Sequence, residues 1–280
     1  MNTKATTSDF IVVIPCYNDL TGLFKALSTV KYDRQFSILV IDDGSAEPIK
    51  REDITPVFPP STTIELIRLS PNVGITKALN AGLNWILDPT KNVIDYKYVA
   101  RLDCGDLCDE NRFSKQVNFL EENNDIDLLG TWCVFENFET GDKFVYTTPT
   151  EDKEIRRAMY FRNIFIHPTV MWRTRILKKN NSYPEIFPHA EDYGLFYKWM
   201  DADIKTAVLP EELVTCRINT KGLSLTNRKG QLKSRLSVIR TFGKNRVLRA
   251  LGVMKLWALM AIPYPLVFKM KKMLLGQSKN

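Results

Sequence analysis

Short apolar runs alternate along the chain with segments in which apolar residues recur every three or four positions. Runs typical of buried strands cover residues 11–14, 38–41, 64–69, 96–102 and 126–135. Helical spacing follows several of these runs, over residues 20–30, 73–87 and 113–120, and returns at residues 195–200. Strands that alternate with helices are joined by right-handed crossovers. The pattern therefore predicts an α/β fold with a mostly parallel sheet flanked by helices.

Polar residues gather where three of the predicted strands end. Residues 15–18 follow the first strand, Asp42 and Asp43 follow the second, and residues 103–106 follow the fourth. In an open parallel sheet the carboxyl ends of the strands lie on one edge, and ligands bind there. The sequence therefore predicts a polar site along this edge.

The alternation ends after residue 135. Gly141 and Asp142 are typical of a hairpin turn, and a mixed region follows them. A chain of 280 residues can bury a full core. We interpret residues 1–225 as one domain and residues 226–280 as a tail of different composition.

The carboxylates of Asp103 and Asp106 lie three residues apart on a turn that contains Gly105. Two such groups can converge on one divalent cation, and Mg²⁺ and Mn²⁺ favour oxygen ligands completed by substrate phosphates. The alternative interpretation is that one of the two carboxylates caps a helix beginning near Asp109.

Two further acidic pairs have a functional and a structural interpretation. Asp42 or Asp43 could bind a nucleobase or a ribose, or the pair could only form a turn, since Asp and Gly are common turn residues. Glu191 and Asp192 could belong to one acidic site with the other pairs, or they could only complement the dipole at the start of a helix.

Charge divides the chain into two regions. It has 39 Lys and Arg and 32 Asp and Glu, for a formal net charge of +7. Residues 213–280 hold 15 of the basic residues and neither Asp nor Glu, so residues 1–212 are net acidic. The tail is therefore strongly cationic.

The tail contains a run of 13 apolar or proline residues at positions 256–268. This run is shorter than the ~20 residues that a spanning helix needs. With basic residues on both sides and with Trp257 and Tyr264 as anchors, it is predicted to lie on an anionic membrane as an amphipathic helical segment, broken at Pro263. The alternative is a helix that packs on the domain. Nucleic-acid binding is not expected, because no recognised nucleic-acid-binding fold accompanies the basic run.

Cysteine usage and the first residues point to a cytoplasmic protein. Five cysteines, an odd number, are too few for a disulfide scaffold in a chain of this length. Residues 1–9 are polar and lack the pattern of a signal peptide. Zinc is not expected either, because the spacing of Cys104 and Cys108 lacks a second matching pair.

Taken together and in order, the motifs resemble the family 2 inverting glycosyltransferases of the GT-A fold, a Rossmann-like architecture, over about residues 10–225. The motifs that carry the resemblance are residues 14–18 (IPCYN), 41–45 (IDDGS), 72–80 (NVGITKALN), 101–106 (RLDCGD) and 167–169 (HPT), and the pair Glu191 and Asp192. The resemblance implies a nucleotide-binding half of about residues 1–130 and an acceptor half of about residues 131–225.

The resemblance also assigns roles to residues. It implies donor binding by Pro15, Tyr17, Asp42, Asp43, Asn72, Lys77, Arg101 and Asp103. It places the Mg²⁺ or Mn²⁺ ligands at Asp103 and Asp106, although Gly105 stands where such members commonly carry an Asp, so either carboxylate could hold the metal and weakened metal dependence stays open. It makes Asp192 the general base, with Glu191 orienting the acceptor or the base. A solvated helix lysine is the alternative for Lys77.

The activity implied by the resemblance is transfer of a sugar from a nucleoside diphosphate sugar, with a UDP-sugar favoured, to an acceptor hydroxyl with inversion. The acceptor would be a glycan or a lipid-linked intermediate in bacterial O-antigen, capsule or exopolysaccharide synthesis. The enzyme would be cytoplasmic and peripheral at the inner face of the cell membrane. The alternative is a noncatalytic module that binds sugar nucleotides or glycans.

Overall fold

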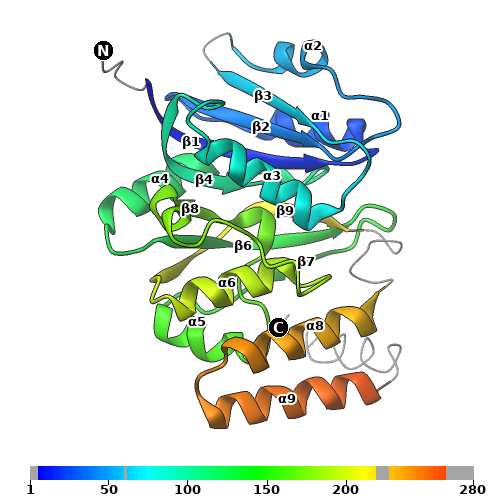
Figure 1. Ribbon diagram of the computed structural model, residues 1–280, viewed down its shortest axis with the longest axis vertical. Coiled ribbons are helices and arrows are strands. Elements are labelled where there is room, and N and C mark those ends of the chain that lie inside the picture. Colours follow the sequence, from blue (N-terminus) through cyan, green and yellow to red (C-terminus); the bar gives the residue numbers. More distant parts are fainter. Residues whose placement is uncertain (1–5, 60–61, 219–226, 263–280) are drawn as a thin grey trace.

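The computed structural model describes residues 6–59, 62–218 and 227–262, and these form a mixed sheet with helices on both faces (Figure 1). The strand order is β3-β2-β1-β4-β8-β6-β9-β5, with β7 paired to β6. The strands are β1 (Thr6–Cys16), β2 (Phe36–Asp42), β3 (Thr63–Arg68), β4 (Ile94–Arg101), β5 (Leu107–Cys108), β6 (Leu128–Asn137), β7 (Lys143–Tyr146), β8 (Met171–Arg173) and β9 (Thr206–Ile218).

Parallel pairing dominates the sheet, as predicted. Four strands lie side by side in the order β3, β2, β1, β4, and each is parallel to the next. Strands β6 and β9 also pair in parallel. Strands β8, β7 and β5 are each antiparallel to their neighbours. The α/β fold class predicted from the apolar pattern is confirmed.

The helices are α1 (Leu20–Thr29), α2 (Arg51–Ile54), α3 (Ile75–Leu87), α4 (Arg112–Glu122), α5 (Asp152–Met159), α6 (Glu191–Asp201), α8 (Arg228–Phe242) and α9 (Arg246–Ala261). Three short 3₁₀ segments, η1 (Thr55–Val57), η2 (His167–Thr169) and η3 (Thr174–Lys178), complete the described elements. Helices α1 and α4 cover one face of the sheet, and α3 and α6 lie over the other (Figure 1).

Alternate residues of the central strands pack on opposite layers. In β1, Phe10, Val12 and Ile14 belong to the core formed with α1 and α4, whereas Ile11 and Val13 belong to the core formed with α3 and α6. Side chains of a strand point to alternate faces. Because helices cover both faces, the strand is apolar at successive positions, which is why it reads as an uninterrupted apolar run.

Several boundaries and elements differ from the sequence prediction. Helix α4 begins at Arg112 rather than near Asp109, and β6 covers Leu128–Asn137 rather than residues 126–135. Strand β9 was not predicted, because a Pro-Glu-Glu segment interrupts its apolar pattern. Its pairing with β6 also shifts register around Trp132. Helix α5 was not predicted, because it is short and mostly charged. The hairpin turn at Gly141 is confirmed by the β6–β7 pairing.

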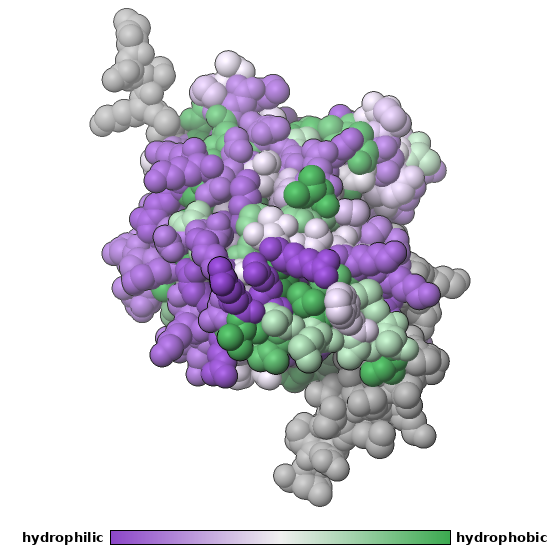
Figure 2. Space-filling view, turned by 60° about the horizontal axis from the view of Figure 1, so that its bottom comes forward, coloured by the Kyte–Doolittle hydropathy of each residue, from purple (hydrophilic) through white to green (hydrophobic). Residues whose placement is uncertain are grey.

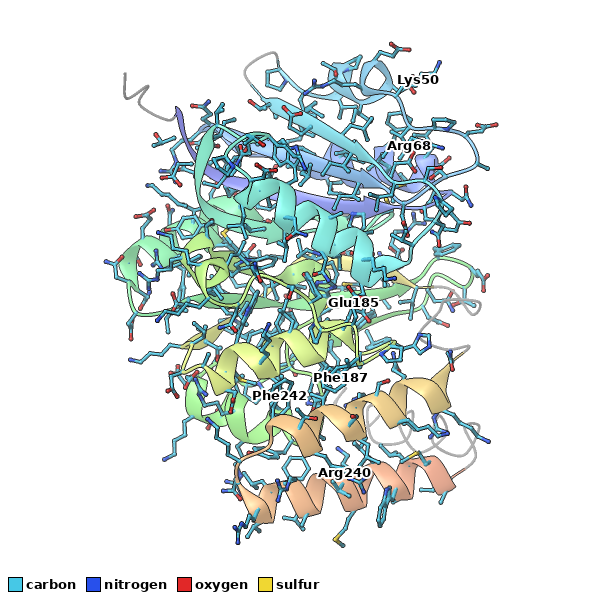
Figure 3. All side chains as sticks on the ribbon, viewed as in Figure 1. Lys50, Arg68, Glu185, Phe187, Arg240 and Phe242 are labelled. Carbon is cyan, nitrogen blue, oxygen red and sulfur yellow. The ribbon has the colours of Figure 1, made fainter. Side chains whose placement is uncertain are left out.

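Helices α8 and α9 form a layer on α6, below the sheet in Figure 1. Phe187, which precedes α6, and Phe242 of α8 point toward each other, with ring centroids 5.9 Å apart (Figure 3). Gly252 of α9 lies against the backbone of Tyr160, and Leu256 is buried. One face of this part of the tail therefore packs on the domain. This packing matches the alternative interpretation of the tail, a helix that packs on the domain.

The other predictions for the tail concern residues of which the structure describes only a part. Residues 219–226, which contain the expected boundary at 225, and residues 263–280, which contain positions 263–268 of the expected interfacial run, lie outside the described residues. Within the residues that are described, every helix is too short or too polar to cross a bilayer.

Candidate functional site

The loops after β1 and β2 are tied together at the carboxyl edge of the sheet. The backbone N–H of Asn18 donates to Ser45 Oγ at 2.9 Å, and Asn18 Oδ1 accepts from the Ala46 N–H at 2.8 Å. The Asp43 N–H donates to the Cys16 carbonyl at 2.9 Å. Between these loops opens a cavity of about 400 Å³, which is lined by residues 18–21, 45–47 and 49.

Asp42 shapes the loop after β2. Its carboxylate is fully buried and accepts from the backbone N–H of Ser45 at 2.9 Å and of Ile49 at 3.3 Å. Arg68 lies at the end of β3 (Figure 3). Its guanidinium forms an ion pair with the same carboxylate and donates to the Ser45 carbonyl. Asp42 therefore fixes the wall of the cavity, and Arg68 offsets the cost of burying its charge.

Asp43 anchors the start of α3. Its Oδ1 accepts from the Val73 N–H at 2.9 Å, and its Oδ2 accepts from the side chain of Asn72 at 2.8 Å and from the Gly74 N–H at 2.9 Å. Gly74 is the N-cap of α3, where a negative charge complements the helix dipole. Asp43 is therefore more than a turn residue, because its contacts bring the Asn72 segment to the site.

Gly44 makes this junction possible. It has a φ of +76°, and a Cβ atom at this position would lie 2.6 Å from the backbone nitrogen of Asn72. Any side chain would therefore be strained and would push the two loops apart.

The other residues predicted to bind the donor differ in exposure. The Tyr17 side chain is 52% exposed. Lys77, on α3, is exposed and forms no ion pair with the described residues. The Pro15 carbonyl accepts a hydrogen bond from Cys104 Sγ at 3.3 Å, which ties the loop after β1 to the loop after β4.

Arg101 is fully buried at the end of β4. Its guanidinium donates to the Val13 carbonyl, to the Leu102 carbonyl at 3.2 Å, to the Asp103 carboxylate, and to His167 Nε2 at 3.3 Å. These hydrogen bonds all join the guanidinium to other groups of the protein. Arg101 therefore contacts Asp103 directly through a hydrogen bond.

Asp103 and Asp106 have different surroundings. The Asp103 side chain is 41% exposed, and one of its oxygens accepts from Arg101. Asp106 is buried, and its Oδ1 accepts from the backbone N–H of Arg217 in β9 at 2.8 Å. Burial raises the pKa of Asp106 well above its ordinary value, and the negative charge of Asp103 adds to the shift. The alternative interpretation, in which one of the two carboxylates caps the next helix, is wrong, because Asn111 is the N-cap of α4.

The turn between these carboxylates carries oxygen ligands of the kind that a divalent cation shares with a phosphorylated ligand. Within residues 6–59, 62–218 and 227–262, no three His, Cys, Asp or Glu side chains are placed to hold a metal by themselves. Mg²⁺ is commonly held by one or two carboxylates together with substrate phosphates. Asp103 is partly exposed and offers carboxylate oxygen to such a site, and burial raises the pKa of Asp106, whose charged form a nearby cation would favour.

Glu191 and Asp192 begin α6, and the carboxyl groups of both have raised pKa values. Asp192 Oδ2 accepts from the Asn163 side chain at 2.9 Å, and Oδ1 accepts from the Tyr193 N–H at 2.6 Å. Burial, followed by the charge of Glu191, raises the pKa of Asp192 to about 7, and the positive charge of Arg235 opposes the shift. Glu191 Oε2 is buried without a hydrogen-bond partner among the described residues.

His167 and Tyr183 connect Arg101 to the loop before α6. Because a guanidinium can only donate, His167 Nε2 accepts from Arg101, and it also accepts from the Tyr183 hydroxyl at 2.9 Å. Burial, with the charge of Arg101, lowers the His167 pKa well below its usual value, so the ring is neutral with its proton on Nδ1. Asn80 of α3 hydrogen-bonds the Tyr183 backbone at 2.7 and 3.1 Å.

Comparison with known proteins identifies the family of this chain. The model of the family named glycosyl transferase family 2 matches residues 11–180, more than half of the chain. The chain belongs to glycosyl transferase family 2. It is therefore a glycosyltransferase. The matched segment contains the loops after β1, β2 and β4 and also His167, and it ends before Glu191.

Curated relatives of this family 2 glycosyltransferase include enzymes of bacterial polysaccharide synthesis. The amylovoran biosynthesis glycosyltransferase AmsE of Erwinia amylovora is 27% identical over 236 residues, which are 82% of this chain and 84% of the relative. The UDP-Gal:alpha-D-GlcNAc-diphosphoundecaprenol beta-1,3-galactosyltransferase of Escherichia coli is 26% identical over 172 residues, 61% of this chain and 58% of the relative.

Solved structures share the fold. S. aureus TarS in complex with UDP-GlcNAc superposes with a TM-score of 0.63 at 18% identity, covering 89% of this chain and 71% of TarS. The mannosyltransferase PcManGT of Pyrobaculum calidifontis, in complex with GDP-Man and Mn²⁺, gives a TM-score of 0.61 at 13% identity, covering 96% of this chain and 81% of that chain.

Sequence reasoning missed four residues that contact the predicted site. Arg68, Tyr183, Asn163 and Arg235 come from four separate segments. Arg68 could have been noticed as a cation at the carboxyl end of a predicted strand, and Asn163 as a polar residue shortly before the HPT motif. Arg235 carries no such signal, because it is one of many basic residues in the tail.

Proposed function

We propose that this glycosyltransferase moves a sugar, with inversion, from a nucleoside diphosphate sugar to a hydroxyl of a growing or lipid-linked glycan in bacterial surface-polysaccharide synthesis. The observation that carries the proposal is the environment of Asp192. A carboxyl group with a pKa raised to about 7 by burial and by Glu191 is poised between its two protonation states near neutral pH. A general base works best when its pKa lies near the working pH.

In the proposed reaction the acceptor hydroxyl oxygen forms a bond to the anomeric carbon. The bond from that carbon to the diphosphate oxygen breaks on the opposite face of the sugar, and its electron pair leaves with the nucleoside diphosphate. The acceptor proton passes to Asp192. Asn163 and the Tyr193 N–H hold the two oxygens of Asp192, so the carboxylate is oriented before the acceptor binds.

Glu191 is the proposed acceptor-binding group. A buried oxygen without a hydrogen-bond partner costs free energy, and a ligand that donates to it recovers that cost. Glu191 Oε2 is such an oxygen among the described residues, at the first turn of the helix that carries Asp192. We assign it to an acceptor hydroxyl.

The donor side uses the loops after β1, β2 and β4. Tyr17 and Lys77 are exposed and are proposed to contact the nucleotide and its phosphates. The cavity whose wall Asp42 fixes lies between the loops after β1 and β2. Asp103, with Asp106 behind it, would hold Mg²⁺ or Mn²⁺, which supplies positive charge to the departing diphosphate. Arg101 orients Asp103 through their hydrogen bond.

The names of relatives support a UDP-sugar and a lipid-linked acceptor. The Escherichia coli relative takes its donor as UDP-Gal and its acceptor as a diphosphoundecaprenol-linked sugar, and TarS is solved with UDP-GlcNAc. A lipid-linked acceptor would place the reaction at the inner face of the cytoplasmic membrane.

Turnover of a panel of UDP-sugars with Mn²⁺ and a diphosphoundecaprenol-linked GlcNAc acceptor, the acceptor in the name of the Escherichia coli relative, tests the proposal through release of UDP and formation of the glycosylated acceptor. We expect turnover of at least one donor and its loss in Asp192→Asn, by about 100-fold or more, because removal of a general base costs about 10² to 10⁴. UDP binding should remain. The matched control is Asp201→Asn, at the far end of the same helix. Turnover of Asp192→Asn at the wild-type rate would remove this residue from the base role.

A further inference from the structure

The outward face of α9 is apolar along its length. Four large hydrophobic side chains are exposed there at spacings of three and four residues: Val247 (68%), Leu251 (46%), Met254 (62%) and Trp257 (54%). Exposed alanines at positions 250, 258 and 261 share this face. A helix whose outer side meets water normally carries polar residues there. We call these seven residues the α9 face.

Packing on the described residues does not account for the α9 face. The opposite side of the helix makes the contacts with the domain, through Gly252 against Tyr160 and through the buried Leu256. Isolated exposed hydrophobic residues are common on proteins, but a continuous helical stripe of them indicates an interaction surface.

Cationic side chains border the α9 face on both sides. The Arg240 guanidinium lies 5.8 Å from the centre of the Trp257 ring on one side, and Lys255 Nζ lies 5.9 Å from the Phe161 ring on the other. Arg246 begins the helix. Figure 2, in which the bottom of the Figure 1 view comes forward, shows hydrophobic residues gathered in its lower part with hydrophilic ones alongside.

The charge around the α9 face selects the partner. Residues 213–280 carry 15 Lys and Arg and neither Asp nor Glu. A second copy of this chain would bring one cationic border against another, which is repulsive. An anionic lipid headgroup complements the border, and an acyl layer accommodates the apolar stripe.

We propose that the α9 face docks on an anionic lipid bilayer, with α9 lying parallel to the membrane plane. The 16 residues of the helix span ~24 Å, too short to cross the hydrocarbon core. Met254 and Leu251 enter the acyl boundary, Trp257 lies at the headgroup level, and Arg240, Arg246 and Lys255 meet lipid phosphates. The inference deepens the proposed function, because a lipid-linked acceptor would lie in the same bilayer, but the docking itself needs no substrate.

Sedimentation of the full chain with vesicles, without any donor or acceptor, tests the proposal. We expect binding to vesicles that contain phosphatidylglycerol, little binding to pure phosphatidylcholine, and weaker binding at high ionic strength. Leu251→Asn combined with Met254→Asn should weaken the partition into anionic vesicles at least about tenfold. Val93→Asn is the matched control, because Val93 is 73% exposed and lies outside α9. A thermal unfolding midpoint like that of the wild type shows that the double variant is folded.

Three outcomes would overturn the proposal. Vesicle binding that the double variant retains in full would place the membrane contact elsewhere in the chain. Equal binding to neutral and anionic vesicles would remove the role of the cationic border. No vesicle binding, with a dimer in sedimentation velocity that the double variant loses, would make the α9 face a self-association surface. Because UDP release is measured separately, none of these results bears on the transferase chemistry.

Discussion

The protonation of Asp192 is set by its burial and by charged groups of α6 and α8. Burial and Glu191 raise its pKa, and Arg235 of α8 lowers it. The Arg235 guanidinium lies over the Tyr193 ring at 5.5 Å, and its Nε is buried without a hydrogen-bond partner in the described part of the chain. A residue of the tail therefore tunes the carboxyl group that we propose as the base.

Substitution of Arg235 should shift the pH dependence of turnover. The base is active when ionised, so the wild-type rate should rise as pH increases through about 7, the pKa of Asp192. Loss of the positive charge in Arg235→Met favours the protonated carboxyl, and the midpoint should move upward by about 0.5 to 1 pH unit. The measurement is turnover against pH.

The control for this shift is Lys233→Met, which removes an exposed positive charge from the same helix. A midpoint that stays at the wild-type pH in Arg235→Met, with activity otherwise intact, would contradict the assigned electrostatic coupling.

At the scale of elements, the packing of helix α9 on the domain depends on the close contact between Gly252 and Tyr160. A Cβ atom on Gly252 would lie 2.2 Å from the carbonyl oxygen of Tyr160. Arg228 of α8 holds the C-terminal end of α9, because its guanidinium donates to the carbonyls of Leu259 and Ile262. Such contacts with the last carbonyls of a helix compensate for its missing hydrogen bonds.

We expect Gly252→Ala to lower the free energy of unfolding by about 1–3 kcal/mol, because the clash with backbone forces α9 away from Tyr160 and outweighs the gain in helix propensity. Chemical denaturation measures the change. Ala250→Ser, on the exposed side of the same helix, should change stability by less than about 0.5 kcal/mol. A Gly252→Ala variant as stable as the wild type would mean that α9 does not pack this closely.

The elements that the sequence predicted are those with a simple local pattern. Strands β1, β2 and β4 are buried on both faces, and α1, α3 and α4 have apolar residues at helical spacing. Strand β9 and helix α5 depend on partners far away in the chain, which local periodicity does not report. The tail shows the same limit. Its composition revealed the charge, but only the tertiary packing shows which side of α9 is covered.

At the scale of the molecule, parallel topology explains how distant acidic residues come to share an edge. Cys16 pairs with Asp42, and Val13 pairs with Arg101, so the loops that follow β1, β2 and β4 begin side by side. The sequence predicted this edge. It did not predict the bridge from Asp103 through Arg101 and His167 to Tyr183, because these contacts join segments that only the folded chain brings together.

The central claim is that these loops form one site for a diphosphate-bearing donor and its metal, with Asp103 at the centre. Calorimetric titration of UDP in the presence of Mn²⁺ tests it most directly, with Asp103→Asn compared with Asp109→Asn, an exposed carboxylate that follows in the same segment. We predict that Asp103→Asn weakens UDP binding at least about tenfold and removes its dependence on Mn²⁺, while Asp109→Asn binds like the wild type. Wild-type affinity and metal dependence in Asp103→Asn would contradict the account.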